Sequence, residues 1–158
     1  MSPLKHFNRP AIEMFGRPIR RANWFSPIII SKVKKSIPKI LIVEDDQFMV
    51  RILTREFNQA GLTTYQIVND GKDVLKEFKK YKPDLMVLDI LLPGKTGLEA
   101  LKEIRELKEG KNVPVFILTN YGNPEFRKLA KDLSVNDYLI KSNTLVSELI
   151  QKIKSLGE

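Results

Sequence analysis

The sequence contains no cysteine, which excludes disulfide bonds, thiolate metal ligands and redox chemistry through thiols. It also lacks any apolar run near the roughly 18 to 20 residues that span a membrane. Its three consecutive isoleucines, residues 28–30, fall far short of the core of a signal peptide. The only histidine, His6, has no candidate partners, and we expect it to have no role. We therefore expect a protein that is neither membrane-inserted nor secreted, in a reducing compartment such as the cytoplasm.

Acidic residues are almost absent from residues 1–37, although the chain as a whole has 19 of them. This segment contains one acid, Glu13, so it holds most of the formal net charge of +8. Its basic residues are Lys5, Arg9, Arg17, Arg20, Arg21, Lys32, Lys34 and Lys35. Several prolines and the lack of an apolar period predict a mostly disordered basic arm. Residues 38–158 are nearly neutral and long enough for one globular domain.

The arm has three interpretations. Its charge could tether the protein to nucleic acid or another acidic surface, or it could be an organellar transit peptide. It could also be an upstream stretch without function, with Met14 as a later translation start. We favour the last interpretation and do not expect the arm to bind nucleic acid specifically.

Residues 39–158 alternate between short aliphatic segments and segments with apolar residues at helical spacing. Five strands are predicted, at residues 39–43, 63–68, 84–88, 113–118 and 135–140. A helix is predicted after each strand, and the last one carries Leu145, Leu149, Ile150, Ile153 and Leu156. This alternation predicts an α/β fold with a doubly wound parallel sheet.

Polar residues and glycine mark the expected helix ends. We expect Asn69 or Asp70 to cap the second helix and Thr96 to cap the third, while Gly61 ends the first. Asp46 either caps the first helix or joins the acids beside it.

Acidic residues follow two of the predicted strands. Glu44 and Asp45 come directly after residues 39–43, and Asp89 follows residues 84–88. Ligands bind beyond the carboxyl ends of strands in open α/β sheets, so these acids can meet there. Two like charges 4 Å apart repel by about 4 kcal/mol at an effective dielectric constant of 20, a conflict that a divalent cation relieves. Carboxylate ligands favour Mg²⁺ or Mn²⁺.

Two further strands end at residues suited to phosphoryl chemistry. Thr119 follows the fourth strand and Lys141 the fifth. A carboxylate can act as a nucleophile and form an aspartyl phosphate, which metal and ammonium charges would stabilise. The strand ends together predict a phosphoryl-transfer site.

Four segments at these strand ends resemble the receiver domains of two-component response regulators. They are LIVEDD (41–46), VLDILLPG (87–94), FILT (116–119) and NDYLIK (136–141). The resemblance covers residues 38–158 and implies a flavodoxin-like five-stranded sheet in the order 2-1-3-4-5.

The resemblance also implies the roles of the acids. Asp89 would accept a phosphoryl group from the phosphohistidine of a histidine kinase. Asp45 would bind Mg²⁺ directly and Glu44 would assist, often through water. Asp89 itself and the backbone carbonyl of Leu91 would complete the protein ligands.

By the same resemblance, Thr119 and Lys141 would contact phosphoryl oxygens and Tyr138 would rotate inward behind Thr119. Receivers usually have proline after the lysine, but Ser142 stands here, and we expect a trans bond because a non-proline cis bond costs about 2.5 to 4 kcal/mol. In the family, the positions of Leu91 and Tyr121 influence the access of water to the phosphoryl group, so their bulky side chains imply slow self-hydrolysis of the aspartyl phosphate.

Three rival sites do not fit. Gly94-Lys95-Thr96 imitates the end of a P-loop, but Asp89 stands where that motif needs glycine. Haloacid-dehalogenase-like phosphohydrolases carry an Asp-x-Asp motif. Here Leu91 stands two residues after Asp89, where the second acid would be. A dinucleotide-binding fold needs a glycine-rich turn after the first strand, which residues 44–47 do not provide.

Too little chain follows Lys141 for an output domain, so we expect a stand-alone receiver that signals by protein contact. It would take phosphate from a sensor histidine kinase or a histidine phosphotransfer protein. It would present its fourth helix, fifth strand and fifth helix to a downstream protein target. It would not be an enzyme, because it would catalyse only its own phosphorylation and its own slow dephosphorylation. The alternatives are a phosphorelay intermediate and a non-phosphorylated adaptor with a nucleic-acid-binding arm.

Overall fold

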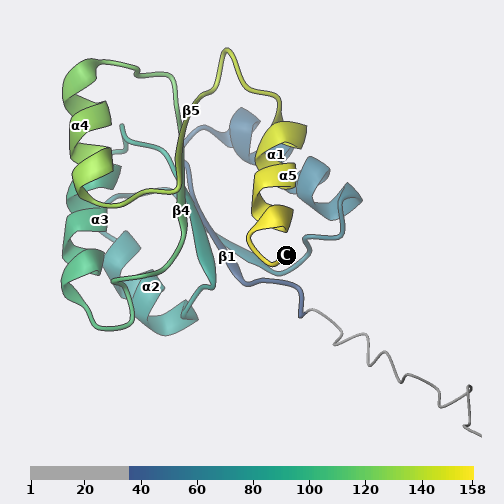
Figure 1. The fold of residues 1–158 in the computed structure, drawn as a ribbon, viewed down its shortest axis with the longest axis horizontal. Helices are drawn as coiled ribbons and strands as arrows, with labels where there is room; N and C mark the ends of the chain where they lie inside the picture. The colour runs from purple at the N-terminus through teal and green to yellow at the C-terminus, as the bar shows by residue number, and fades with distance from the viewer. Residues whose placement is uncertain (1–35) are drawn as a thin grey trace, which may run out of the picture. The chain divides into compact units, whose positions relative to one another are not determined.

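The computed structural model describes residues 36–158, which form a five-stranded parallel sheet flanked by helices (Figure 1). The elements in chain order are β1 (Ile40–Val43), α1 (Gln47–Gln59), β2 (Tyr65–Val68), α2 (Val74–Tyr81), β3 (Leu85–Leu88), α3 (Gly97–Glu106), β4 (Val115–Thr119), α4 (Pro124–Asp132), β5 (Asp137–Ile140) and α5 (Val146–Ser155). The strand order is β2-β1-β3-β4-β5, and each neighbouring pair is parallel. The predicted fold class and strand order are confirmed. The predicted arm, residues 1–37, falls almost wholly outside the described residues.

Helices cover both faces of the sheet. Figure 1 shows α2, α3 and α4 on one side and α1 and α5 on the other. Side chains along a strand alternate between faces, so each strand contributes to two cores. In β1, Leu41 and Val43 belong to the core that includes α2, α3 and α4, whereas Ile40 and Ile42 belong to the core with α1 and α5. All four are buried, which explains why this strand is aliphatic throughout.

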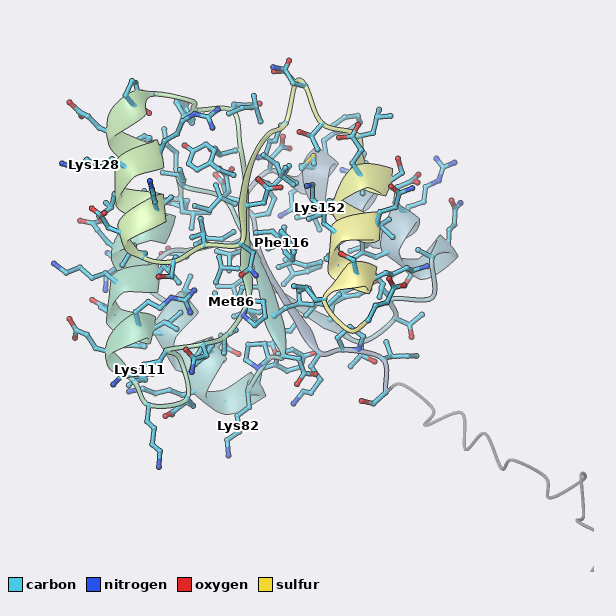
Figure 2. The ribbon with its side chains drawn as sticks, in the orientation of Figure 1. Lys82, Met86, Lys111, Phe116, Lys128 and Lys152 are labelled. Atoms are coloured by element: carbon cyan, nitrogen blue, oxygen red, sulfur yellow. The ribbon has the colours of Figure 1, made fainter. Side chains whose placement is uncertain are left out.

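The side chains follow the same division between interior and surface. Met86 and Phe116 lie in the interior, and both are buried, whereas Lys82, Lys111 and Lys128 project from the periphery (Figure 2). Within residues 36–158, no helix combines the length and the apolar character that crossing a membrane would require.

Two of the predicted caps are present. The Asp46 side chain accepts a hydrogen bond from the Phe48 backbone N–H (2.9 Å) and caps α1. Thr96 caps α3 in a capping box, in which Thr96 Oγ1 accepts from the Glu99 N–H and the Glu99 carboxylate accepts from the Thr96 N–H. Gly61 follows the end of α1 with φ of 81°, the left-handed conformation that glycine adopts without strain.

The prediction that Asn69 or Asp70 caps the second helix is wrong. Helix α2 begins only at Val74, and Asp70 instead accepts a hydrogen bond from the Lys72 N–H (2.8 Å) inside a turn. Gly71 donates its N–H to the Pro93 carbonyl (3.0 Å). A side chain on Gly71 would meet the backbone of Lys95. The turn is therefore packed against the loop after β3, and this contact delays the start of the helix.

Candidate functional site

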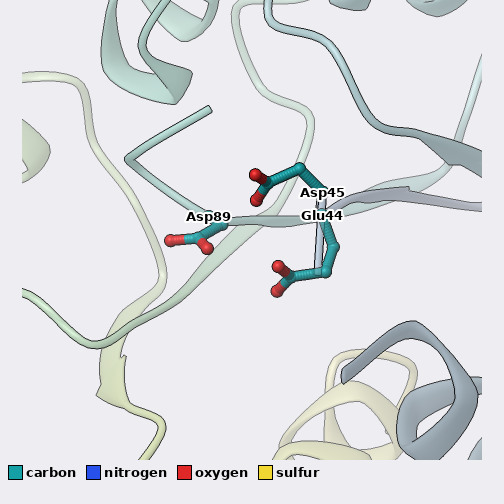
Figure 3. A group of neighbouring side chains, drawn as sticks. All are labelled: Glu44, Asp45 and Asp89. Carbon is teal, nitrogen blue, oxygen red and sulfur yellow. The ribbon is translucent and has the colours of Figure 1, made fainter. Parts of the chain in front are cut away.

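The three predicted acids meet at one edge of the sheet. Glu44 and Asp45 follow β1, Asp89 follows β3, and the two strands are neighbours with Val43 paired to Leu88. One carboxylate oxygen from each acid lies within 4.8 Å of the others. Figure 3 shows the three side chains gathered at this edge. Glu44 and Asp89 are buried, whereas Asp45 is exposed. The cluster is thus buried on one side and open to solvent on the other.

Lys141 joins two of these acids. Its ammonium nitrogen lies 2.7 Å from Glu44 Oε2 and 2.7 Å from Asp89 Oδ2. Each carboxylate is also fixed by a backbone N–H: Glu44 Oε1 accepts from Asp46 (3.0 Å) and Asp89 Oδ1 accepts from Ile90 (2.7 Å). The backbone of Lys141 pairs with the end of β4, since its N–H donates to the Thr119 carbonyl (2.9 Å). The sheet therefore brings the ends of β1, β3, β4 and β5 to one site.

The electrostatics of the site follow from burial and from this shared lysine. Burial raises the pKa of Glu44, and the hydrogen bond from Lys141 only partly opposes that effect. Burial alone would lower the pKa of Lys141, but hydrogen bonds to Asp89 and Glu44 outweigh it and the net pKa is raised. Lys141 therefore stays a cation at neutral pH.

The donor set fits a hard divalent cation. The cluster offers three carboxylates, which with one ammonium leave two negative charges uncompensated when all are ionised. Oxygen ligands of this kind suit Mg²⁺ or Mn²⁺. The predicted ligands Glu44, Asp45 and Asp89 are therefore together and chemically suited to a metal, and the role of the Leu91 carbonyl stays a prediction.

Thr119 is the last residue of β4, and Tyr138 lies in the neighbouring strand β5. Thr119 is fully buried, and its hydroxyl oxygen accepts a hydrogen bond from the Tyr121 N–H (3.4 Å). The Tyr138 hydroxyl donates to the Tyr121 carbonyl (2.5 Å). Burial raises the pKa of Tyr138, Arg127 lowers it and Asp89 raises it further. The two predicted switch residues are therefore linked through one residue of the β4–α4 loop.

The remaining predictions concern the loops around the site. The peptide bonds of the described residues are all trans, including that between Lys141 and Ser142, as expected. Leu91 and Tyr121 both expose their side chains, with relative exposures of 37% and 47%. Their predicted effect on hydrolysis stays a prediction.

Two contacts of the site were not predicted from the sequence. One is the ion pair between Glu44 and Lys141, and the other is the position of Arg127 over the Tyr138 ring, with the guanidinium carbon 4.6 Å from the ring centroid. The partners lie far apart in the sequence or on different elements. The strand ends place Glu44 and Lys141 at one site but do not show that they pair directly. The position of α4, which brings Arg127 onto the Tyr138 ring, cannot be predicted from the strand ends.

Comparisons with known proteins agree with this geometry. Residues 40–154 match the family model of the response regulator receiver domain. The chain is 40% identical over 104 residues to sporulation initiation phosphotransferase F of Bacillus subtilis (strain 168), covering 65% of this chain and 81% of that protein. It is 33% identical over 105 residues to alkaline phosphatase synthesis transcriptional regulatory protein PhoP of the same organism, covering 65% of this chain and 42% of that protein.

A similar solved structure is the Mn²⁺-bound form of response regulator Rcp1, with a TM-score of 0.60 and 31% identity, covering 75% of this chain and 92% of that one. The chain thus spans most of phosphotransferase F but less than half of PhoP. From the family match, the relatives and the shared fold, we conclude that this chain belongs to the receiver-domain family of two-component response regulators.

Proposed function

We propose that Asp89 accepts a phosphoryl group from the phosphohistidine of a sensor histidine kinase or a histidine phosphotransfer protein. A carboxylate oxygen of Asp89 would attack phosphorus, the phosphorus–nitrogen bond would break, and the histidine would keep that electron pair. The supporting observation is the Lys141 ammonium, 2.7 Å from Asp89 and within the same cluster of acids. A cation so placed can pair with the charge that builds up on a phosphoryl group.

Asp45, Asp89, the Leu91 carbonyl and, through water, Glu44 would hold Mg²⁺ or Mn²⁺. The bound cation would neutralise charge on the phosphoryl oxygens. The chain's own residues would orient the group: Lys141 would pair with one phosphoryl oxygen, and the Thr119 hydroxyl would donate a hydrogen bond to another. The solved Mn²⁺-bound form of Rcp1 supports this assignment of the metal.

The test is labelling with radioactive acetyl phosphate, with and without Mg²⁺, in the intact protein and in Asp89→Asn. We expect label that depends on both Asp89 and Mg²⁺. Asp73→Asn is the matched control, because Asp73 is an exposed acid whose side chain makes no capping hydrogen bond. Absence of label from the intact protein and from the control, with and without Mg²⁺, would instead favour the non-phosphorylated adaptor.

Output would pass through protein contact, from the face formed by α4, β5 and α5 to a downstream target in the cytoplasm. The protein would act as a stand-alone receiver and catalyse only its own phosphoryl transfer and dephosphorylation. A change in this face on phosphorylation is supported by two contacts: Lys141, at the end of β5, pairs with Asp89, and Tyr138 of β5 is linked to Thr119 through Tyr121.

A second candidate is a phosphorelay intermediate. It is favoured by the relative named a phosphotransferase, most of whose length the chain covers. Incubation of the labelled protein with an isolated histidine phosphotransfer protein separates the two. Rapid movement of label to the histidine supports the relay, and label that stays on Asp89 supports direct output.

A further inference from the structure

The β4–α4 loop is held by side chains from two other elements. The Tyr138 hydroxyl of β5 donates to the Tyr121 carbonyl (2.5 Å), and Nε of Arg127 in α4 donates to the carbonyl of the next residue, Gly122 (3.2 Å). The Tyr121 N–H donates to Thr119 Oγ1 (3.4 Å). Hydrogen bonds to two consecutive carbonyls and from one N–H of this loop thus connect it to β5, α4 and β4.

Arg127 contacts both the loop and the aromatic ring. Its guanidinium carbon lies 4.6 Å from the centroid of the Tyr138 ring while Nε bonds to Gly122. A planar guanidinium can stack on an aromatic face and donate hydrogen bonds in its own plane at the same time. A lysine ammonium has no such plane, so it can keep the ring contact without reproducing the bond to the loop.

We propose that Arg127 is a positioning residue that couples the orientation of the Tyr138 ring to the conformation of residues 120–123. If the ring turns away from its observed position, the guanidinium loses its aromatic contact, and the bond to Gly122 is weakened as well. The loop and the ring therefore change together rather than one by one. This inference rests on the proposed function only for its consequence, that the coupled unit responds to a phosphoryl group on Asp89.

The neighbouring residue Lys128 supplies a matched control. It is exposed, carries the same charge and lies on the same helix. Lys128→Gln and Arg127→Gln therefore remove one positive charge each from α4, but only the second removes the contacts to the ring and the loop. If Arg127 acted merely through its charge, the two variants would behave alike.

The experiment uses the intact protein labelled with 3-fluorotyrosine and ¹⁵N, with the Tyr138 resonance assigned through Tyr138→Phe. In Arg127→Gln, without any phosphoryl donor, we expect the Tyr138 ¹⁹F resonance to shift together with the amide resonance of Asn123, whose peptide includes the Gly122 carbonyl. The ratio of ring orientations should change by about two- to fivefold, which corresponds to the ~0.5–1 kcal/mol of an exposed cation–π contact. Arg127→Lys should restore the ring resonance in part but not the Asn123 amide resonance.

Titration with beryllofluoride and Mg²⁺ then tests the coupling. In the unmodified protein and in Lys128→Gln, the ring resonance and the Asn123 amide resonance should shift at the same beryllofluoride concentration, whereas in Arg127→Gln they should shift at different concentrations. The proposal is overturned if Arg127→Gln matches Lys128→Gln in all of these signals. If Arg127→Gln does not fold, an Asn123 amide resonance in Arg127→Lys that is unchanged from the unmodified protein overturns it. No response to beryllofluoride in any protein would refute the proposed function, while the shifts measured without it would still decide the coupling.

Discussion

At the scale of single residues, Lys141 is the side chain on which the buried part of the site depends. It is the common partner of Glu44 and Asp89, whose side chains retain only 2% and 8% of their exposure. Lys141→Met should therefore leave both carboxylates close together and remove one hydrogen-bond partner from each. We expect the free energy of unfolding to fall by about 1–3 kcal/mol. Urea unfolding in EDTA measures this loss, and Mg²⁺ should partly reverse it by replacing the missing positive charge. Lys152→Met is the control, because the side chains of its ion pair with Asp137 are far more exposed and solvent screening should make that pair contribute much less.

The same residue predicts a dependence on pH. The folded state raises the pKa of Lys141 from its usual value of 10.5, so folding favours the protonated lysine. Its contribution to stability is full below that usual pKa and is lost as the pH rises through the higher pKa of the folded state. The difference in unfolding free energy between the unmodified protein and Lys141→Met should thus be constant at neutral pH and shrink above pH 10.5. A difference that grew with alkaline pH would contradict the ion pair.

Leu91 bears on the lifetime of the phosphoryl group. It stands two residues beyond Asp89 with an exposed apolar side chain, so we expect it to limit the approach of water to an acyl phosphate. Leu91→Asn should lose label from Asp89 several times faster than the unmodified protein in a pulse-chase experiment with Mg²⁺. Leu156→Asn replaces another exposed leucine, near the C-terminus, and should leave the rate unchanged. A lifetime of seconds or less in the unmodified protein would refute the prediction.

At the scale of elements, adjacent acids at the start of α1 have different tasks. Asp46 caps the helix, so Asp46→Ala should cost about 1 kcal/mol of stability and leave Mg²⁺ affinity nearly unchanged. Asp45 is exposed and belongs to the acid cluster, so Asp45→Ala should abolish Mg²⁺ binding with little loss of stability. Thermal unfolding with and without Mg²⁺ measures both effects, since a ligand stabilises only the state that binds it. Similar losses of Mg²⁺ affinity in both variants would show that Asp46 is also a ligand.

The elements also show how far the sequence could predict the structure. Aliphatic segments that end in acids, threonine or lysine identify both the strands and their carboxyl ends, so Glu44, Asp45, Asp89, Thr119 and Lys141 could be placed together before the structure was known. The error at Asp70 has another origin. A capping residue was available there, but the packing of the turn against the loop after β3 decided where α2 begins. Arg127 was missed because an exposed arginine on a helix has no pattern that reveals the ring beneath it.

At the scale of the whole molecule, the charge and the folded domain are separate in the sequence. The net charge of +8 comes mainly from residues 1–37, whereas the two cores and the acid cluster belong to residues 40–153. Deletion of residues 1–35 should therefore leave the free energy of unfolding and the labelling of Asp89 unchanged, while salt-dependent retention on a heparin column should fall because most of the positive charge is gone. Chemical denaturation, acetyl phosphate labelling and chromatography of both proteins test this.

The full chain with its arginines at 17, 20 and 21 changed to glutamine is the control, since it keeps the length and removes charge. A loss of stability above about 1 kcal/mol on deletion, absent from that control, would mean that the domain extends into the arm.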